Sequence, residues 1–99
     1  MLLSENATIR SLLPRFCEEW ERDFTVQFPK LRASGDTEGI RRMGHTVKGS
    51  FAQFGVSAGS PLGEALMRAA AAGDWDAADA VVADLFALIQ QVKAAIARG

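Results

Sequence analysis

The spacing of apolar residues in the last quarter of the chain constrains the fold more than any other feature of the sequence. Between residues 75 and 96 these side chains recur at alternating intervals of three and four residues, as Trp75, Ala78, Val82, Leu85, Ile89, Val92 and Ile96. Such intervals place every member on one face of an α-helix. Because a helix of this kind depends on packing of its apolar face, the segment predicts a helical core.

Three earlier segments show the same kind of periodicity. At Gly35-Asp36 and Gly73-Asp74 a glycine follows one predicted C-terminus and an aspartate can cap the next N-terminus. Helices are expected over residues 12–33, 37–54, 61–72 and 75–98. Helices joined by short loops bury their apolar faces best as an antiparallel up-and-down bundle. We therefore predict an all-α four-helix bundle with a short N-terminal extension.

Serine and proline residues refine the expected helix ends. Ser11 is the expected N-cap of the first helix, and residues 1–10, which lack a clear period, are expected to be mobile or loosely docked. Ser60 is the expected cap of the third helix, with Pro61 at its first position. Pro29 is expected to kink or loosen the end of the first helix, because it has no N–H to donate.

Length, charge and cysteine content limit the classes of function. The 99 residues are expected to form one domain, 1–99, since two separate cores would be too small. A formal net charge of -1 argues against nucleic acid or an anionic membrane as a partner. The single cysteine excludes a disulfide framework, and we expect no metal site and no cofactor. Cys17, Trp20 and Trp75 lie on apolar faces and are expected in the core.

Targeting segments are not evident in the sequence. The opening residues turn polar after Leu3, so no signal-peptide apolar region is present. No apolar run approaches the roughly 18 residues of a membrane span. We therefore expect a cytoplasmic protein. We also expect a monomer.

The only histidine in the sequence lies away from the apolar face of its helix. If Ile40 is set at zero and each residue adds about 100°, the apolar face centres at roughly -15° and His45 falls at about 140°. This geometry excludes His45 from the core. Arg41, Arg42 and Lys48 lie one turn away on the same helix. Three cations around one imidazole favour a dianionic group placed on it.

A glycine one turn after the histidine is unexpected in the middle of a helix. Gly49 falls at about 180° from Ile40 and costs roughly 1 kcal/mol of helix stability relative to alanine. Bundle packing does not require a glycine on the solvent face. With Ala52 beside it, Gly49 leaves a flat patch on which another protein could approach the imidazole.

The segment that begins at His45, HTVKGSFAQFG, resembles the signature H-x-[hydrophobic]-K-G-[S/A]-x-x-x-[hydrophobic]-G of histidine-containing phosphotransfer (HPt) domains. The two Gly-Asp junctions and Pro14-Arg15-Phe16 also resemble that family. The likeness extends over about residues 10–98.

The resemblance implies a role for several residues. His45 would be the phosphoacceptor and Lys48 the cation that steadies the phosphoryl group. Ser50 would be a supporting polar residue, and Gly55 would end the helix. Docking of a partner, with clearance beside the imidazole, is expected at Gly49, Arg41, Arg42 and Ala52.

Two residues depart from the family pattern. Gly44 stands where alanine is common before the histidine, and it is expected to loosen the helix next to the site. Phe51 stands where a small residue is frequent. At about 20° from Ile40 it is expected to point inward and to change packing rather than chemistry.

The resemblance implies a phosphocarrier that is not an enzyme on its own. Neutral imidazole is a good nucleophile near neutral pH. A response-regulator receiver domain would supply an aspartate, Mg²⁺ and most of the catalysis, and a sensor histidine kinase would feed the relay. Two alternatives stay open. The first is an HPt domain cut from a hybrid or chemotaxis-type kinase, although Met1 favours an intact start. The second is a degenerate bundle that only binds a partner.

Overall fold

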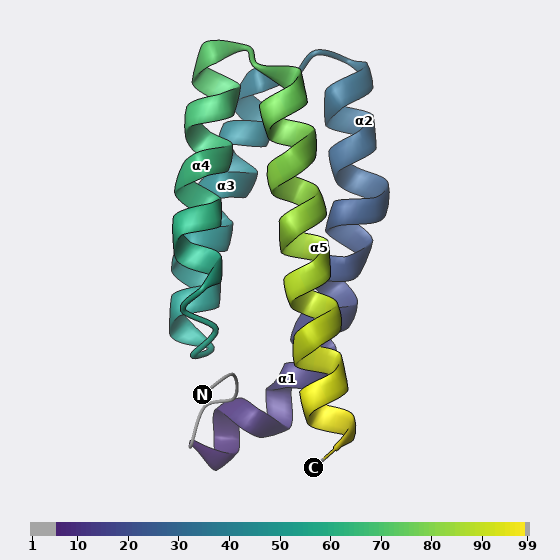
Figure 1. Cartoon of the computed structure of the whole chain (residues 1–99), viewed down its shortest axis with the longest axis vertical. Helices are drawn as coiled ribbons and strands as arrows, with labels where there is room; N and C mark the ends of the chain where they lie inside the picture. The colour runs from purple at the N-terminus through teal and green to yellow at the C-terminus, as the bar shows by residue number, and fades with distance from the viewer. Residues whose placement is uncertain (1–5, 99) are drawn as a thin grey trace.

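The computed structural model describes residues 6–98, and helices account for nearly all of them (Figure 1). α1 (Ala7–Arg22), η1 (Asp23–Gln27) and α2 (Phe28–Ala33) follow one another directly and form one long helix. The remaining elements are α3 (Thr37–Gln53), α4 (Gly59–Ala72) and α5 (Trp75–Ala97). No strand occurs within residues 6–98. The predicted all-α four-helix bundle is confirmed.

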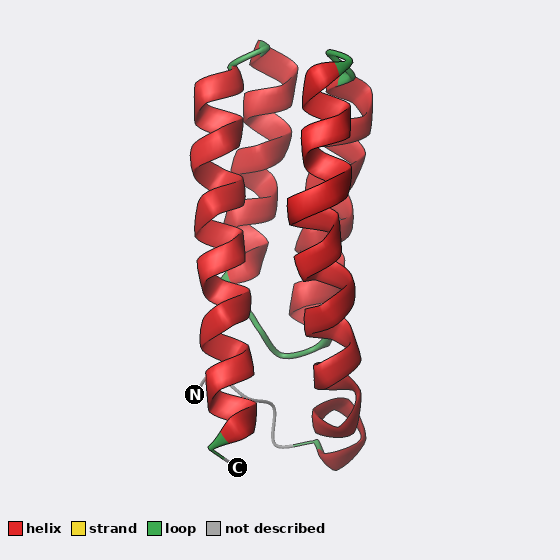
Figure 2. Cartoon of the chain, turned by 90° about the vertical axis from the view of Figure 1, so that its right-hand side faces the viewer, coloured by secondary structure: helices red, strands yellow, loops and turns green. Residues whose placement is uncertain are grey.

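The four helical segments form an elongated up-and-down bundle that measures 39 × 20 × 17 Å. Figures 1 and 2 together show that α5 lies beside α4 and beside the long first helix. The lower ends of α1 and α5 extend beyond the turn that joins α3 to α4, as Figure 2 also shows. α3 likewise packs against α4 on one side and against the first helix on the other.

The first helix begins earlier than the sequence predicts. Its N-cap is Asn6, whose side-chain oxygen accepts hydrogen bonds from the backbone N–H groups of Thr8 and Ile9. The expected cap, Ser11, is wrong, because its hydroxyl donates to the carbonyl of Thr8 within the helix. Of the expected loose start, residues 7–10 are helical, while residues 1–5 lie outside the described part of the chain.

A wide π turn, η1, interrupts the first helix directly before Pro29. Here the N–H of Phe28 donates to the carbonyl of Asp23, five residues earlier. Pro29 has no N–H that could donate a hydrogen bond to a carbonyl of the preceding turn. Regular α-helical hydrogen bonding therefore cannot continue through it. The expected loosening thus falls in the turn before the proline, and the helix continues to Ala33.

Glycines and aspartates form the turns at the upper end of the bundle. Gly35 and Gly73 have φ values of +67° and +65°, a region that favours glycine. Asp36 and Asp74 then cap α3 and α5 by accepting from backbone N–H groups. At the other end, α4 starts at Gly59, before the expected Ser60-Pro61.

The core is continuous along the bundle and contains the expected apolar positions of each helix. Phe51 on α3 is fully buried, and its ring lies 4.9 Å from that of Phe16 and 5.5 Å from that of Trp20, both edge-on. Cys17 is also buried, which raises the pKa of its thiol to about 11 and keeps it protonated near neutral pH. The largest fully buried side chains are Phe51, Leu13, Ile40, Leu66, Leu85, Ile89, Val47, Val56, Val92 and Cys17.

The closest helix pair is α3 and α4, which meet at two glycines. A Cβ placed on Gly44 would lie 2.7 Å from the carbonyl oxygen of Gly63 and 2.8 Å from Cγ of Met67. A Cβ on Gly63 would lie 2.6 Å from the carbonyl oxygen of Gly44. The backbones can approach this closely only because neither residue carries a side chain.

α5 is bound to the end of the first helix through polar contacts. Nε and Nη2 of Arg32 donate to the two carboxylate oxygens of Asp79 at 2.8 and 3.0 Å. The same guanidinium lies 5.7 Å from the ring centroid of Trp75, which is half-buried and not fully in the core.

Contrary to the expectation from apolar runs, α5 is long and apolar enough to cross a membrane by length and composition alone. Core helices of bundles pass the same test, and the apolar stripe of α5 packs against the other helices.

Candidate functional site

His45 lies on the outer face of α3, with its side chain exposed. The opposite face of the same helix carries Ile40, Val47 and Phe51, which are fully buried. Because these three side chains fix the rotation of α3 about its axis, the imidazole must face away from the core. The helical-wheel position of His45 therefore agrees with the structure.

The three cations near His45 are exposed, but they do not share one environment. Nη2 of Arg41 donates to Oε1 of Glu38 at 2.5 Å, one turn earlier on α3. Nζ of Lys48 lies 2.8 Å from Oε1 of Glu64 on α4. Within residues 6–98, Arg42 forms no ion pair, although its charge helps to lower the pKa of Glu38. Two of the three positive charges are therefore already paired.

The two ion pairs lower the pKa values of their carboxyl groups, Glu38 and Glu64. The hydrogen bond from Lys48, together with its charge, holds the pKa of Glu64 below its ordinary value. The hydrogen bond from Arg41 lowers the pKa of Glu38 in the same way. Both acids are thus fully ionised near neutral pH, and each pair stays intact there.

Lys48 has a second connection to α4 that the sequence did not predict. The hydroxyl of Ser60, the expected helix cap, instead donates to the backbone carbonyl of Lys48 at 2.9 Å. Ser60 and Glu64 therefore both contact Lys48 from one face of α4. Sequence analysis missed both residues, because the spacing within α4 does not reveal which turn of α3 lies opposite.

The small residues that follow His45 leave its surroundings open. Gly49 is exposed. Among the described residues, no atom beyond its two chain neighbours and the nearby backbone of α3 lies within 4 Å of the position that its Cβ would occupy. Ala52 is exposed on the next turn. Ser50 is half-buried on the side that faces α1. α3 ends at Gln53, and Gly55 follows with a φ of +78°.

Gly44 does not loosen the helix next to His45, contrary to the sequence-based expectation. It is buried in the close contact with Gly63, so α3 is held firmly against α4 at this position. The expectation failed because a glycine weakens a helix only where its missing side chain is not used for packing.

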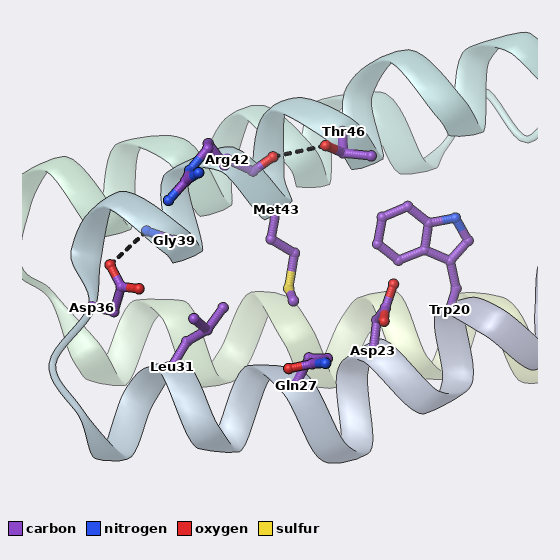
Figure 3. A pocket seen from close by; sticks show the side chains of 9 residues that line it. All are labelled: Trp20, Asp23, Gln27, Leu31, Asp36, Gly39, Arg42, Met43 and Thr46. Atoms are coloured by element: carbon purple, nitrogen blue, oxygen red, sulfur yellow. Dashed lines mark hydrogen bonds between the residues drawn. The ribbon is translucent and has the colours of Figure 1, made fainter.

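A groove of about 350 Å³ lies on the other side of α3, between this helix and the long first helix (Figure 3). Met43 points into it from α3, and Asp23 and Gln27 line the facing wall. Burial raises the pKa of the Asp23 carboxyl above its ordinary value. Arg42 and Thr46 border the groove, so it adjoins the exposed face that carries His45.

Chemically, the arrangement presents one nucleophilic imidazole to solvent beside cations on the same helix. Such a surface can accept an anionic group and hold it by charge. Within residues 6–98 no cluster of three or more His, Cys, Asp and Glu side chains could hold a metal ion.

Comparison with known proteins identifies one family. The family model for the Hpt domain matches residues 8–96 of the chain. Searches of curated proteins and of solved structures gave no significant match.

The two glycines on either side of His45 should respond oppositely to alanine. We expect Gly49→Ala to raise the free energy of unfolding by about 0.5–1 kcal/mol, because the added methyl group meets open space and the unfolded chain loses freedom. We expect Gly44→Ala to lower it by about 1–3 kcal/mol, because Gly63 and Met67 must move. Urea denaturation of both variants measures the two changes. A stabilising Gly44→Ala would show that α3 and α4 are not in close contact.

Proposed function

The chain belongs to the Hpt domain family, and from this premise we propose that His45 carries the phosphoryl group. Family membership implies histidine phosphotransfer in phosphorelay signalling, through receiver domains and histidine kinases. The observation that carries the assignment is that the only histidine in the sequence lies exposed on α3, beside Lys48 and Gly49. It is therefore the one imidazole that could be modified.

The proposed reaction requires only an exposed ring nitrogen and an acyl phosphate on the partner. One nitrogen of the neutral His45 imidazole attacks phosphorus while the bond between phosphorus and the aspartyl oxygen breaks. The products are the phosphorylated imidazole, a free aspartate carboxylate and one proton, which leaves the other ring nitrogen for solvent. The reverse reaction passes the group to another receiver domain. Positioning and charge neutralisation supply most of the catalysis in such transfers.

The residues around His45 would bind the phosphoryl group and the partner. Lys48, three residues after His45, would contact a phosphoryl oxygen, since side chains at this spacing are neighbours on a helix. Arg41 and Arg42 would add positive charge at the docking surface. Gly49 and Ala52 would let the receiver approach the imidazole. Ser50 would support the packing beneath that surface. Gly55, in the turn that follows α3, would stop the helix from continuing.

The protein would act as a phosphocarrier in the cytoplasm, as a monomer. The receiver domain would bring the aspartate and a Mg²⁺ ion, and a sensor histidine kinase would supply phosphate to the relay. An HPt domain within a hybrid or chemotaxis-type kinase would use the same site. A degenerate bundle that only binds a partner is disfavoured because His45, Lys48 and Gly49 are all present.

Replacing the imidazole tests the assignment directly. We expect His45→Gln to leave the unfolding midpoint nearly unchanged, because the side chain is exposed, and to abolish phosphate acceptance from a ³²P-charged receiver. Thr46→Ala, at the next exposed position, is the matched control and should accept phosphate normally. Label on wild type should be lost in acid and kept in alkali. Label on His45→Gln, or acid-stable label, would mean that another group is the acceptor.

A series of side chains at position 49 tests the proposed clearance. Gly49→Ala, Gly49→Gln and Gly49→Leu should all stabilise the helix, but the two larger side chains should slow transfer from the receiver to His45. Thermal melts and rapid-quench transfer rates measure the two effects. If Gly49→Gln is more stable than wild type and equally fast, the glycine does not serve receiver access.

A further inference from the structure

Lys48 is connected to α4 at both its backbone and its side chain. Ser60 donates to its carbonyl oxygen, and Glu64, one turn further along α4, lies 2.8 Å from its Nζ. A residue that served only as a free cation on the surface of α3 would not require either contact. The position of the ammonium group is thus determined by α4 as well as by α3.

The glycine contact explains why Glu64 can reach Lys48. Gly63 precedes Glu64, and a Cβ on Gly63 would lie 2.7 Å from the backbone nitrogen of Lys48. The absence of that side chain brings α4 directly against the backbone of Lys48. The carboxylate of Glu64 then lies at the edge of this contact, where the Lys48 side chain emerges.

The ion pair can open without unfolding the bundle. The side chains of Lys48 and Glu64 remain 50% and 47% exposed, so water can replace either partner. Nη1 of Arg68 lies 4.0 Å from the other carboxylate oxygen of Glu64. When the ammonium moves away, Arg68 remains close enough to balance the charge that Lys48 leaves behind.

A phosphoryl group on His45 would compete for the same ammonium. Lys48 is one turn from His45 on the same helix, and its four-carbon side chain can turn toward either acceptor. A phosphoryl group carries nearly two negative charges near neutral pH, whereas Glu64 carries one. The ammonium is therefore shared between a carboxylate that is always present and a phosphoryl group that is present only after transfer.

We propose that Glu64 is a positioning residue that holds Lys48 toward α4 while His45 is unmodified and competes with the phosphoryl group once His45 is modified. This inference rests on the proposed function of His45. Its consequence is that Glu64 makes the phosphorylated form less favourable and readier to return its phosphoryl group to a receiver. The transfer reaction itself is unchanged, and only the ion pair rearranges.

Glu64→Gln is the variant that tests this role, because the amide oxygen can still accept from Lys48 while the negative charge is lost. Wild type and variant are equilibrated with one phosphorylated receiver domain, and the ratio of phosphorylated to free bundle is measured. We expect Glu64→Gln to raise this ratio about two- to fivefold, the range expected for one exposed ion pair. Circular dichroism checks that the variant is folded.

The chain offers a matched control in a second ion pair between helices. Nζ of Lys93 on α5 lies 3.0 Å from Oε2 of Glu21 on α1, with similar exposure and away from α3. Glu21→Gln should leave the phosphorylation ratio unchanged. A rise equal to that of Glu64→Gln would attribute the effect to net charge and would overturn the proposal.

A double-mutant cycle distinguishes an effect of Glu64 through Lys48 from direct repulsion between the Glu64 carboxylate and the phosphoryl group. In a Lys48→Ala background, Glu64→Gln should change the ratio by much less than it does in wild type. An undiminished effect there, or no effect of Glu64→Gln in wild type, would overturn the role of Glu64. Failure of wild type to gain an acid-labile phosphoryl group would instead contradict the proposed function itself, so the two failures can be distinguished.

Discussion

The close contact between Gly44 and Gly63 is the constraint on which the candidate site depends. Without side chains at these two positions, the backbones of α3 and α4 approach so closely that a Cβ on either glycine would clash with the carbonyl oxygen of the other. This contact lies between Ile40 and Val47 along α3 and holds the helix at the level of His45. It also sets the register that brings Ser60 and Glu64 to Lys48. A glycine that weakens an isolated helix is here used to join two helices closely.

The aromatic core fixes the remaining freedom of α3, its rotation. Phe51 packs between Phe16 and Trp20 of α1 and is fully buried, and Gly59 of α4 leaves the space that its ring occupies. With Phe51 held inward, His45 and Gly49 must lie on the outer face. The proposed phosphoacceptor and the buried core residues therefore lie on opposite faces of one helix, and substitutions on the outer face should affect the core little.

Sequence periodicity predicts the helices well, because each apolar stripe is a local pattern that burial makes obligatory. The same pattern correctly placed His45 outside the core and Phe51 inside it. It could not predict how two helices are aligned along their axes, and the misplaced residues all depend on that alignment or on an alternative cap. Ser60 bonds to Lys48 instead of capping α4, Gly44 packs instead of loosening, and Glu64 was not considered. Asn6 caps the first helix in place of Ser11, since both residue types suit that position.

Because the chain contains one histidine, the proposal that His45 carries the phosphoryl group can be tested directly by NMR. A sample with ¹⁵N-labelled histidine, phosphorylated by a receiver domain, has a single labelled imidazole whose NMR signals report on His45 alone. We predict a one-bond scalar coupling between ³¹P and one ring nitrogen of His45, present in the phosphorylated sample and lost after brief exposure to acid. A stoichiometric ³¹P signal with no coupling to either imidazole nitrogen would contradict the proposal.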